Sequence, residues 1–142
     1  MTHPTPVNWQ PISKIALIAS MIDGALDDTH DHMKTLTEAR AKPDVLDDAT
    51  IDRVDQVHLE QLEFVDIYAQ QIRRWRTENP STDQDRELDR MEKQNQQLRI
   101  VTEEILTLAR ELRKGTIDRI LGMNDVELGL RALRNNKPTS RS

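Results

Sequence analysis

Apolar side chains recur mostly at steps of three and four residues, or their sum, through three successive stretches of the sequence, and this spacing is typical of amphipathic α-helices. The first stretch contains Ile12, Ile15, Ile22, Leu26, Thr29, Met33 and Leu36. The second contains Val54, Val57, Leu62, Val65, Tyr68, Ile72 and Trp75. The third contains Leu88, Met91, Asn95, Leu98, Val101, Ile105, Leu108 and Leu112. We therefore predict an all-α fold with three long helices, each about 30 residues or roughly 45 Å in length.

Local signals mark where these helices end. Pro43 lacks a backbone donor and disfavours helix in the residue before it, so the first helix should end near residue 41. Asp47 is a good N-cap for the second helix, and the pair Ser81 and Gln84 matches a capping box for the third. Gly115 fits the C′ position after the third helix.

Helices of equal length joined by short breaks pack as antiparallel neighbours, which predicts an up-down-up bundle. Trp9 precedes the first helix and Trp75 closes the second. In this topology these two ends of the chain meet. We therefore expect the two indoles to lie close together, beside the turn between the second and third helices.

The C-terminal region carries a shorter helical pattern. Asn124 and Glu127 form another capping box, and Val126, Leu130 and Leu133 follow on one face. We expect this helix to bury apolar surface either on its own bundle or on another chain. The domain organisation is then an extended lead-in at residues 1–11, one helical-bundle domain at 12–134, and a flexible tail at 135–142.

Two further features suggest a partner. Asn95 lies in the apolar stripe of the third helix, where a lone Asn either fixes register between associating helices or makes a hydrogen bond inside one bundle. Four large apolar residues fall on the polar sides of the helices, namely Leu17, Leu59, Ile67 and Ile100. Such surplus apolar surface needs cover from the short C-terminal helix or from another chain.

Charge and composition exclude several classes of function. Residues 1–80 carry 8 Lys and Arg against 14 Asp and Glu, and an acidic half of this kind disfavours a nucleic-acid partner. The basic run "RRWR" at residues 73–76 is better explained by cations near a helix C-terminus. The longest apolar run, at residues 15–22, is too short to span a membrane, and there are no cysteines. We expect a cytoplasmic protein without a membrane or an identifiable small-molecule substrate as partner.

The stretch "DDTHDHM" at residues 27–33 raises the question of a metal site. At about 100° per residue, His30 and His32 flank the apolar stripe on opposite sides, so they cannot share one ion. A site between helices is the remaining alternative. Asp27 with His30 and Asp55 with His58 resemble the acid-x-x-His pairs of di-iron bundles, and a hairpin could bring them together. Asp is shorter than Glu, and we expect no bound metal or other cofactor.

The sequence thus indicates a non-enzymatic helical-bundle protein that acts through protein–protein contacts, alone or as a homodimer. The alternative is a metal-binding helical-bundle enzyme that uses Asp or Glu and His ligands. The sequence contains neither a glycine-rich phosphate loop nor a serine or cysteine nucleophile beside a base.

Overall fold

The computed structural model describes residues 7–42 and 46–121, and for residues 116–121 it describes the backbone alone. A short 3₁₀ helix, η1 (Ile12–Lys14), leads into α1 (Ile15–Arg40). Two further helices follow, α2 (Asp48–Arg76) and α3 (Thr82–Leu121). Strands are absent from the described ranges, so the predicted all-α class is confirmed.

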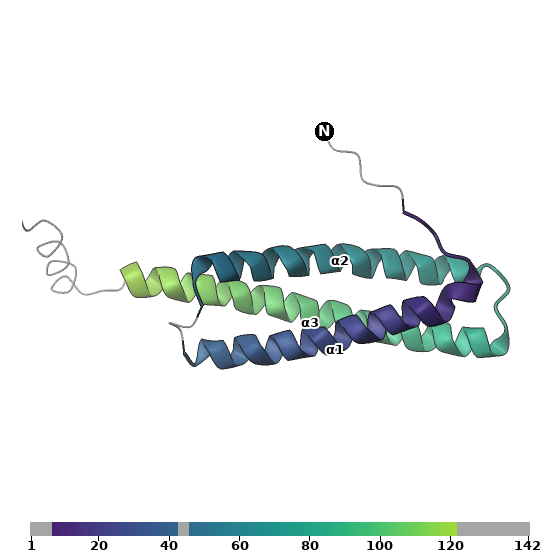
Figure 1. The fold of residues 1–142 in the computed structure, drawn as a ribbon, viewed down its shortest axis with the longest axis horizontal. Helices are drawn as coiled ribbons and strands as arrows, with labels where there is room; N and C mark the ends of the chain where they lie inside the picture. The colour runs from purple at the N-terminus through teal and green to yellow at the C-terminus, as the bar shows by residue number, and fades with distance from the viewer. Residues whose placement is uncertain (1–6, 43–45, 122–142) are drawn as a thin grey trace, which may run out of the picture.

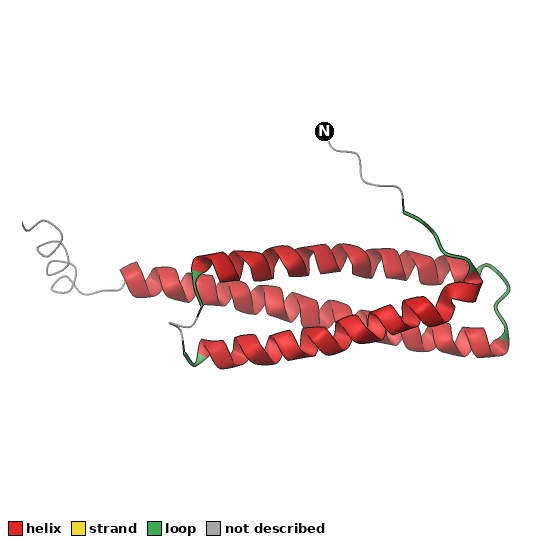
Figure 2. Cartoon of the chain, viewed as in Figure 1, coloured by secondary structure: helices red, strands yellow, loops and turns green. Residues whose placement is uncertain are grey.

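The three helices form an elongated up-down-up bundle. Figure 1 shows that α1 and α3 run in the same direction along the long axis, whereas α2 runs in the opposite direction. Short loops join the helices at alternate ends (Figure 2). Both α1 and α2 pack along α3, whereas α1 and α2 approach each other closely at only a few positions. Helix α3 is therefore the one on which both α1 and α2 pack.

The predicted caps of α2 and α3 are present. The carboxylate of Asp47 accepts a hydrogen bond of 2.8 Å from the backbone N–H of Thr50. Ser81 and Gln84 form the reciprocal pair of a capping box, with bonds of 2.8 and 3.1 Å. Just before this box, Asn79 adopts a left-handed conformation with φ of 52°, which Asn tolerates better than most residues. These local interactions, together with the ion pairs of Arg76 with Asp89 and Glu92, hold the turn between α2 and α3.

The prediction that Gly115 ends the third helix is wrong. Helix α3 continues through it to Leu121. Glycine inside a helix costs only about 0.5–1 kcal/mol relative to alanine. After the glycine, Ile120 and Leu121 follow Ile117 at steps of three and four residues, so the helical spacing resumes. A periodic pattern that persists on both sides therefore outweighs one weak position.

The end of the bundle where α1 begins is closed by hydrogen bonds to the chain before η1. Trp75 is fully buried, and its indole Nε1 donates to the carbonyl of Gln10 at 2.9 Å. The backbone N–H of Gln10 donates to Oε1 of Gln71 at 2.7 Å. The guanidinium of Arg74 lies 4.3 Å from the centre of the Trp9 ring. Both indoles thus lie at this end, as the up-down topology predicted.

A polar layer in the middle of the bundle connects all three helices. Gln61 on α2 donates from Nε2 to the hydroxyls of Thr29 on α1 and Thr102 on α3, each at 2.8 Å. Each hydroxyl donates in turn to a carbonyl four residues earlier in its own helix, at 2.6 Å. Both threonines are fully buried. The amide nitrogen and both hydroxyls have partners, so the layer favours one relative register of the helices.

We predict that Gln61→Ala lowers the free energy of unfolding by about 1–3 kcal/mol, because two hydrogen bonds worth about 0.5–1.5 kcal/mol each are lost. Urea titration followed by circular dichroism measures this change. Gln70→Ala is the matched control, since Gln70 is an exposed glutamine on the same helix. Equal stability of the two variants would show that the polar layer does not stabilise the bundle.

Candidate functional site

An apolar groove lies between α1 and α2 near the end of the bundle that Trp75 closes. It has a volume of about 420 Å³. Leu17 and Met21 of α1 line one wall, and Phe64 and Ile67 of α2 line the other. Val7, from the chain before η1, lies at its edge. Leu17, Met21 and Phe64 are each about half exposed, at 51, 45 and 53%. We call this surface the α1–α2 groove.

The groove follows from how the helices divide their apolar residues. Leu17 and Met21 are four residues apart, and Phe64 and Ile67 are three apart, so each pair forms a short stripe on one helix face. These stripes are separate from the wider apolar faces that pack on α3. Because α1 and α2 approach each other closely at only a few positions, the second stripes remain uncovered by the described part of the chain.

The sequence predicted part of this surface. Leu17 and Ile67 were expected on the polar sides of their helices, and both line the groove. Leu59 and Ile100 were expected there too, and they are exposed at other places on the surface. The prediction that Val57 belongs to the core stripe is wrong, because its side chain is 45% exposed on the side facing away from α3. Met21 and Phe64 were missed, although their spacing from Leu17 and Ile67 was a usable signal.

A second hollow, of about 310 Å³, lies between α1 and α2 toward the opposite end of the bundle. Thr35 and Leu36 of α1 face Val54 and Val57 of α2 across it. Leu46, from the loop before α2, closes one side. We call this surface the distal hollow. His32 and His58 also line it.

These two histidines form a direct bridge between α1 and α2. Nδ1 of the buried His58 lies 2.7 Å from the carbonyl of Val54, which only accepts, so this nitrogen carries the proton. Nε2 of His58 is then the acceptor for Nδ1 of His32, at 3.4 Å. The two rings meet edge to face. Burial lowers the pKa of His58, and the neighbouring His32 lowers it further.

The four residues considered for a metal site are not brought together. His58 meets His32, whereas His30 is exposed on the other side of α1. Asp55 accepts a bond of 2.7 Å from Arg113 of α3, and Asp27 faces solvent. Within residues 7–42 and 46–115, whose side chains the structure describes, no three His, Asp or Glu side chains are arranged to hold an ion. These four residues stay apart because the rotation of α1 about its axis turns His32, and not His30, toward α2.

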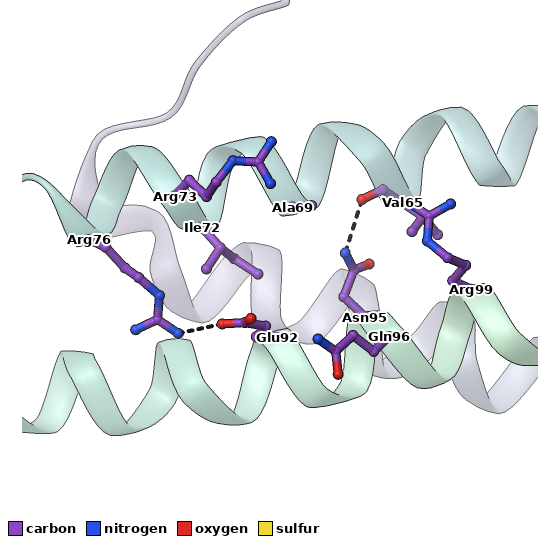
Figure 3. Close-up of a pocket in the computed structure, with 9 residues that line it drawn as sticks. All are labelled: Val65, Ala69, Ile72, Arg73, Arg76, Glu92, Asn95, Gln96 and Arg99. Carbon is purple, nitrogen blue, oxygen red and sulfur yellow. Dashed lines mark hydrogen bonds and ion pairs between the residues drawn. The ribbon is translucent and has the colours of Figure 1, made fainter.

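Asn95 makes its hydrogen bond within the bundle, which is the second of the two alternatives that the sequence left open. The buried amide donates from Nδ2 to the carbonyl of Val65 on α2, at 2.9 Å (Figure 3). Its Oδ1 is buried and has no partner. The side chain lines a hollow of about 260 Å³ between α2 and α3, beside Arg73 and the ion pair of Arg76 with Glu92. The other residues predicted to mediate interaction, Val126, Leu130 and Leu133, lie outside the described residues.

The side of the bundle formed by α1 and α2 is strongly acidic. Neither the stretch 15–33 of α1 nor the stretch 54–72 of α2 contains Lys or Arg, and together they carry eight carboxylates. Three of these carboxylates, on Asp23, Asp55 and Asp66, pair with arginines of α3. The bonds to Arg90 hold the pKa of Asp23 below its usual value. The other five of these eight carboxylates are exposed and make no ion pair with another described residue; they belong to Asp27, Asp28, Asp31, Glu60 and Glu63.

No family model, curated protein or solved structure matches this chain. In the part of the chain that the structure describes, no helix has the length and apolar character needed to cross a membrane. The features on which a functional argument can rest are therefore the α1–α2 groove, the distal hollow and the acidic side chains around them.

We predict that the bundle loses stability as the pH falls below about 6.5, the pKa of histidine in an unfolded chain. Because the folded state lowers the pKa of His58, the unfolded chain binds more protons below that pH. The stability that neutral His58 contributes is therefore complete above pH 6.5. It is lost as the pH falls from 6.5 through the lower pKa that His58 has in the folded state. The slope reaches at most about 1.4 kcal/mol per pH unit for one proton.

Urea titrations between pH 7.5 and 5.0 measure this slope. In His58→Gln the slope should be smaller, whereas the exposed His30→Gln should retain it. Asp55, on the same helix, and His32, on α1, are the ionisable groups that act on His58. An equal slope in both variants would contradict the assignment to His58.

We also predict that Asn95→Leu stabilises the bundle by about 1 kcal/mol or more. Removing a buried oxygen that has no partner recovers about 1–3 kcal/mol, which exceeds the roughly 0.5–1.5 kcal/mol of the lost hydrogen bond. Urea titration measures the gain, with the exposed Gln96→Leu as control. Light scattering tests whether the mass changes as well, because a buried Asn can also fix the number of associating helices. A loss of stability would show that the bond to Val65 outweighs the unpaired oxygen.

Proposed function

We propose that this chain is a small cytoplasmic, non-enzymatic interaction protein whose α1–α2 groove receives an amphipathic helix from a protein partner. The observation that carries this proposal is the set of large, half-exposed apolar side chains that line one hollow. Single exposed apolar residues are ordinary on protein surfaces. Several of them grouped in one concavity are typical of binding sites instead.

The shape of the groove favours a helix as the ligand. Two antiparallel helices that diverge beside a third leave the position that a fourth helix occupies in a four-helix bundle. An amphipathic helix can place residues spaced by three and four into such a groove. Leu17 and Met21 on one wall and Phe64 and Ile67 on the other can pack on both sides of its apolar stripe.

The charges around the groove define the polar face of the partner. Five carboxylates without ion pairs to described residues lie on the α1 and α2 stretches that continue from it. A partner helix that carries Lys or Arg beside its apolar anchors complements this potential, and complementary charge accelerates association. The same carboxylates disfavour nucleic acid, whose phosphates they repel. They also oppose a homodimer through this face, because two acidic surfaces would meet.

The alternative of a metal-dependent enzyme has less support. The four residues that suggested it are divided between a histidine bridge, an Arg113 ion pair and solvent. We expect purified protein to hold no stoichiometric zinc, iron or manganese after dialysis.

The proposal predicts that Phe64→Glu abolishes capture of a specific partner. Quantitative cross-linking in the native cell compares wild type, Phe64→Glu and Ile100→Glu. Ile100 is equally exposed but lies on α3, outside the groove, so it is the matched control. A buried side chain of this size contributes about 1.5–3 kcal/mol, so at least a tenfold loss of the captured partner is expected for Phe64→Glu alone.

Thermal melts of the three proteins establish that the two variants remain folded. Met21→Glu provides a second test on the opposite wall of the groove. If every captured protein is retained by both groove variants, the α1–α2 groove is not the binding site and the proposal fails.

A further inference from the structure

The distal hollow has mostly apolar walls that the described part of the chain leaves uncovered, and Arg53 of α2 is also in its lining. Leu36 and Val54 form its floor, and Val57 projects from α2 with 45% of its surface exposed. The α1–α2 groove is a separate hollow toward the other end of the same two helices. Occupation of the distal hollow therefore does not depend on the partner proposed above.

The described chain ends at the same end of the bundle as this hollow. Arg113 pairs with Asp52 and Asp55 in the first turns of α2, and Arg40 at the end of α1 lies 3.8 Å from Glu111. Helix α3 continues eight residues beyond Arg113 to Leu121, which is about 12 Å. Figure 1 shows this overhang projecting past the start of α2 and the end of α1. The 21 residues that follow begin with Gly122, a residue that favours a change of direction.

The sequence after Gly122 has the properties of a returning helix. The capping box of Asn124 and Glu127 marks a helix start, and Val126, Leu130 and Leu133 share one face. A helix from 124 to 136 is about 20 Å long, so it exceeds the 12 Å overhang. Running back antiparallel to α3, it places Leu130 and Leu133 beside the first turns of α2, where Thr50 and Val54 line the distal hollow.

The charge of this segment complements the surface toward which it runs. From residue 128 onward it contains Arg131, Arg134, Lys137 and Arg141 and no Asp or Glu. Beyond the distal hollow, in the direction of such a helix, lie the unpaired Asp31 and Glu60. Basic residues near a helix C-terminus also interact favourably with the helix dipole. Charge therefore favours the same direction as the topology.

We propose that residues 124–137 dock in cis into the distal hollow as a short fourth helix, with Leu130 and Leu133 as the apolar anchors. This arrangement completes an up-down-up-down bundle with one more short connection. Attachment through a short connection gives the segment an effective concentration in the millimolar range, which favours its own hollow over that of a second copy.

Engineered disulfides test this placement directly, since the natural sequence has no cysteine. The full chain carrying Val57→Cys and Leu133→Cys should form an intramolecular disulfide under mild oxidation, seen as a faster band without reductant. The control pairs Val57→Cys with Leu128→Cys, because Leu128 lies on the opposite face of the expected helix. We expect at least tenfold more cross-linking in the first pair. Equal cross-linking in both pairs, or disulfide-linked dimers in the first, would overturn docking in cis.

A second measurement does not rely on cysteines. Leu130→Glu with Leu133→Glu should lower the thermal midpoint of the full chain by several degrees, whereas Leu128→Glu should leave it nearly unchanged. Identical midpoints for all three proteins would also overturn the proposal. Capture of a partner through Phe64 is measured in the same variants. If the partner is still captured when the C-terminal segment does not dock, only the docking proposal fails. If the partner is not captured although the segment docks, only the proposed function fails.

Discussion

The arrangement of the three helices depends most on the pair of hydrogen bonds that the amide of Gln61 donates. A single side chain from α2 donates to a hydroxyl on α1 and to another on α3, both at 2.8 Å. Apolar contacts alone tolerate small shifts of one helix along another, because leucine and isoleucine pack acceptably in several registers. An amide bonded to two buried hydroxyls does not, since a displaced Gln61 would leave polar groups without partners at about 1–3 kcal/mol each. The polar layer therefore selects one register from several that hydrophobic burial would allow.

This register has a consequence for the surface. With α1 and α2 both held against α3, their remaining apolar residues face the space between them. Leu17 and Phe64 illustrate this, because each lies beside a core residue of its own helix but projects away from α3. The bridge between His32 and His58 crosses the same space within the distal hollow. The two hollows between α1 and α2 are thus a result of how the core is built.

The sequence predicted what depends on local order along the chain. The three helices, the Asp47 cap and the capping box of Ser81 with Gln84 are each encoded within a few residues, and all are confirmed. Features that depend on the rotation of one helix against another were harder. His30 and His32 lie at equal angles from the apolar stripe, so the sequence could not decide which would meet His58. For the same reason Val57 fitted the stripe of α2, although its side chain lies at the edge that α3 does not cover.

The distribution of arginine connects the stability of the bundle to its proposed recognition. Helix α3 supplies Arg90, Arg99 and Arg113, and each pairs with a carboxylate on α1 or α2. Such exposed pairs contribute little to folding, typically 0–1 kcal/mol. Their larger effect is to neutralise the acidic residues nearest α3, so that the remaining negative charge lies on the side of α1 and α2 that faces away from it. Like charges on this side disfavour contact with a second copy of itself, and they favour a basic helix as the proposed ligand. One set of charges would therefore both oppose self-association and select the ligand, whether it is the C-terminal segment of the chain or a helix from another protein.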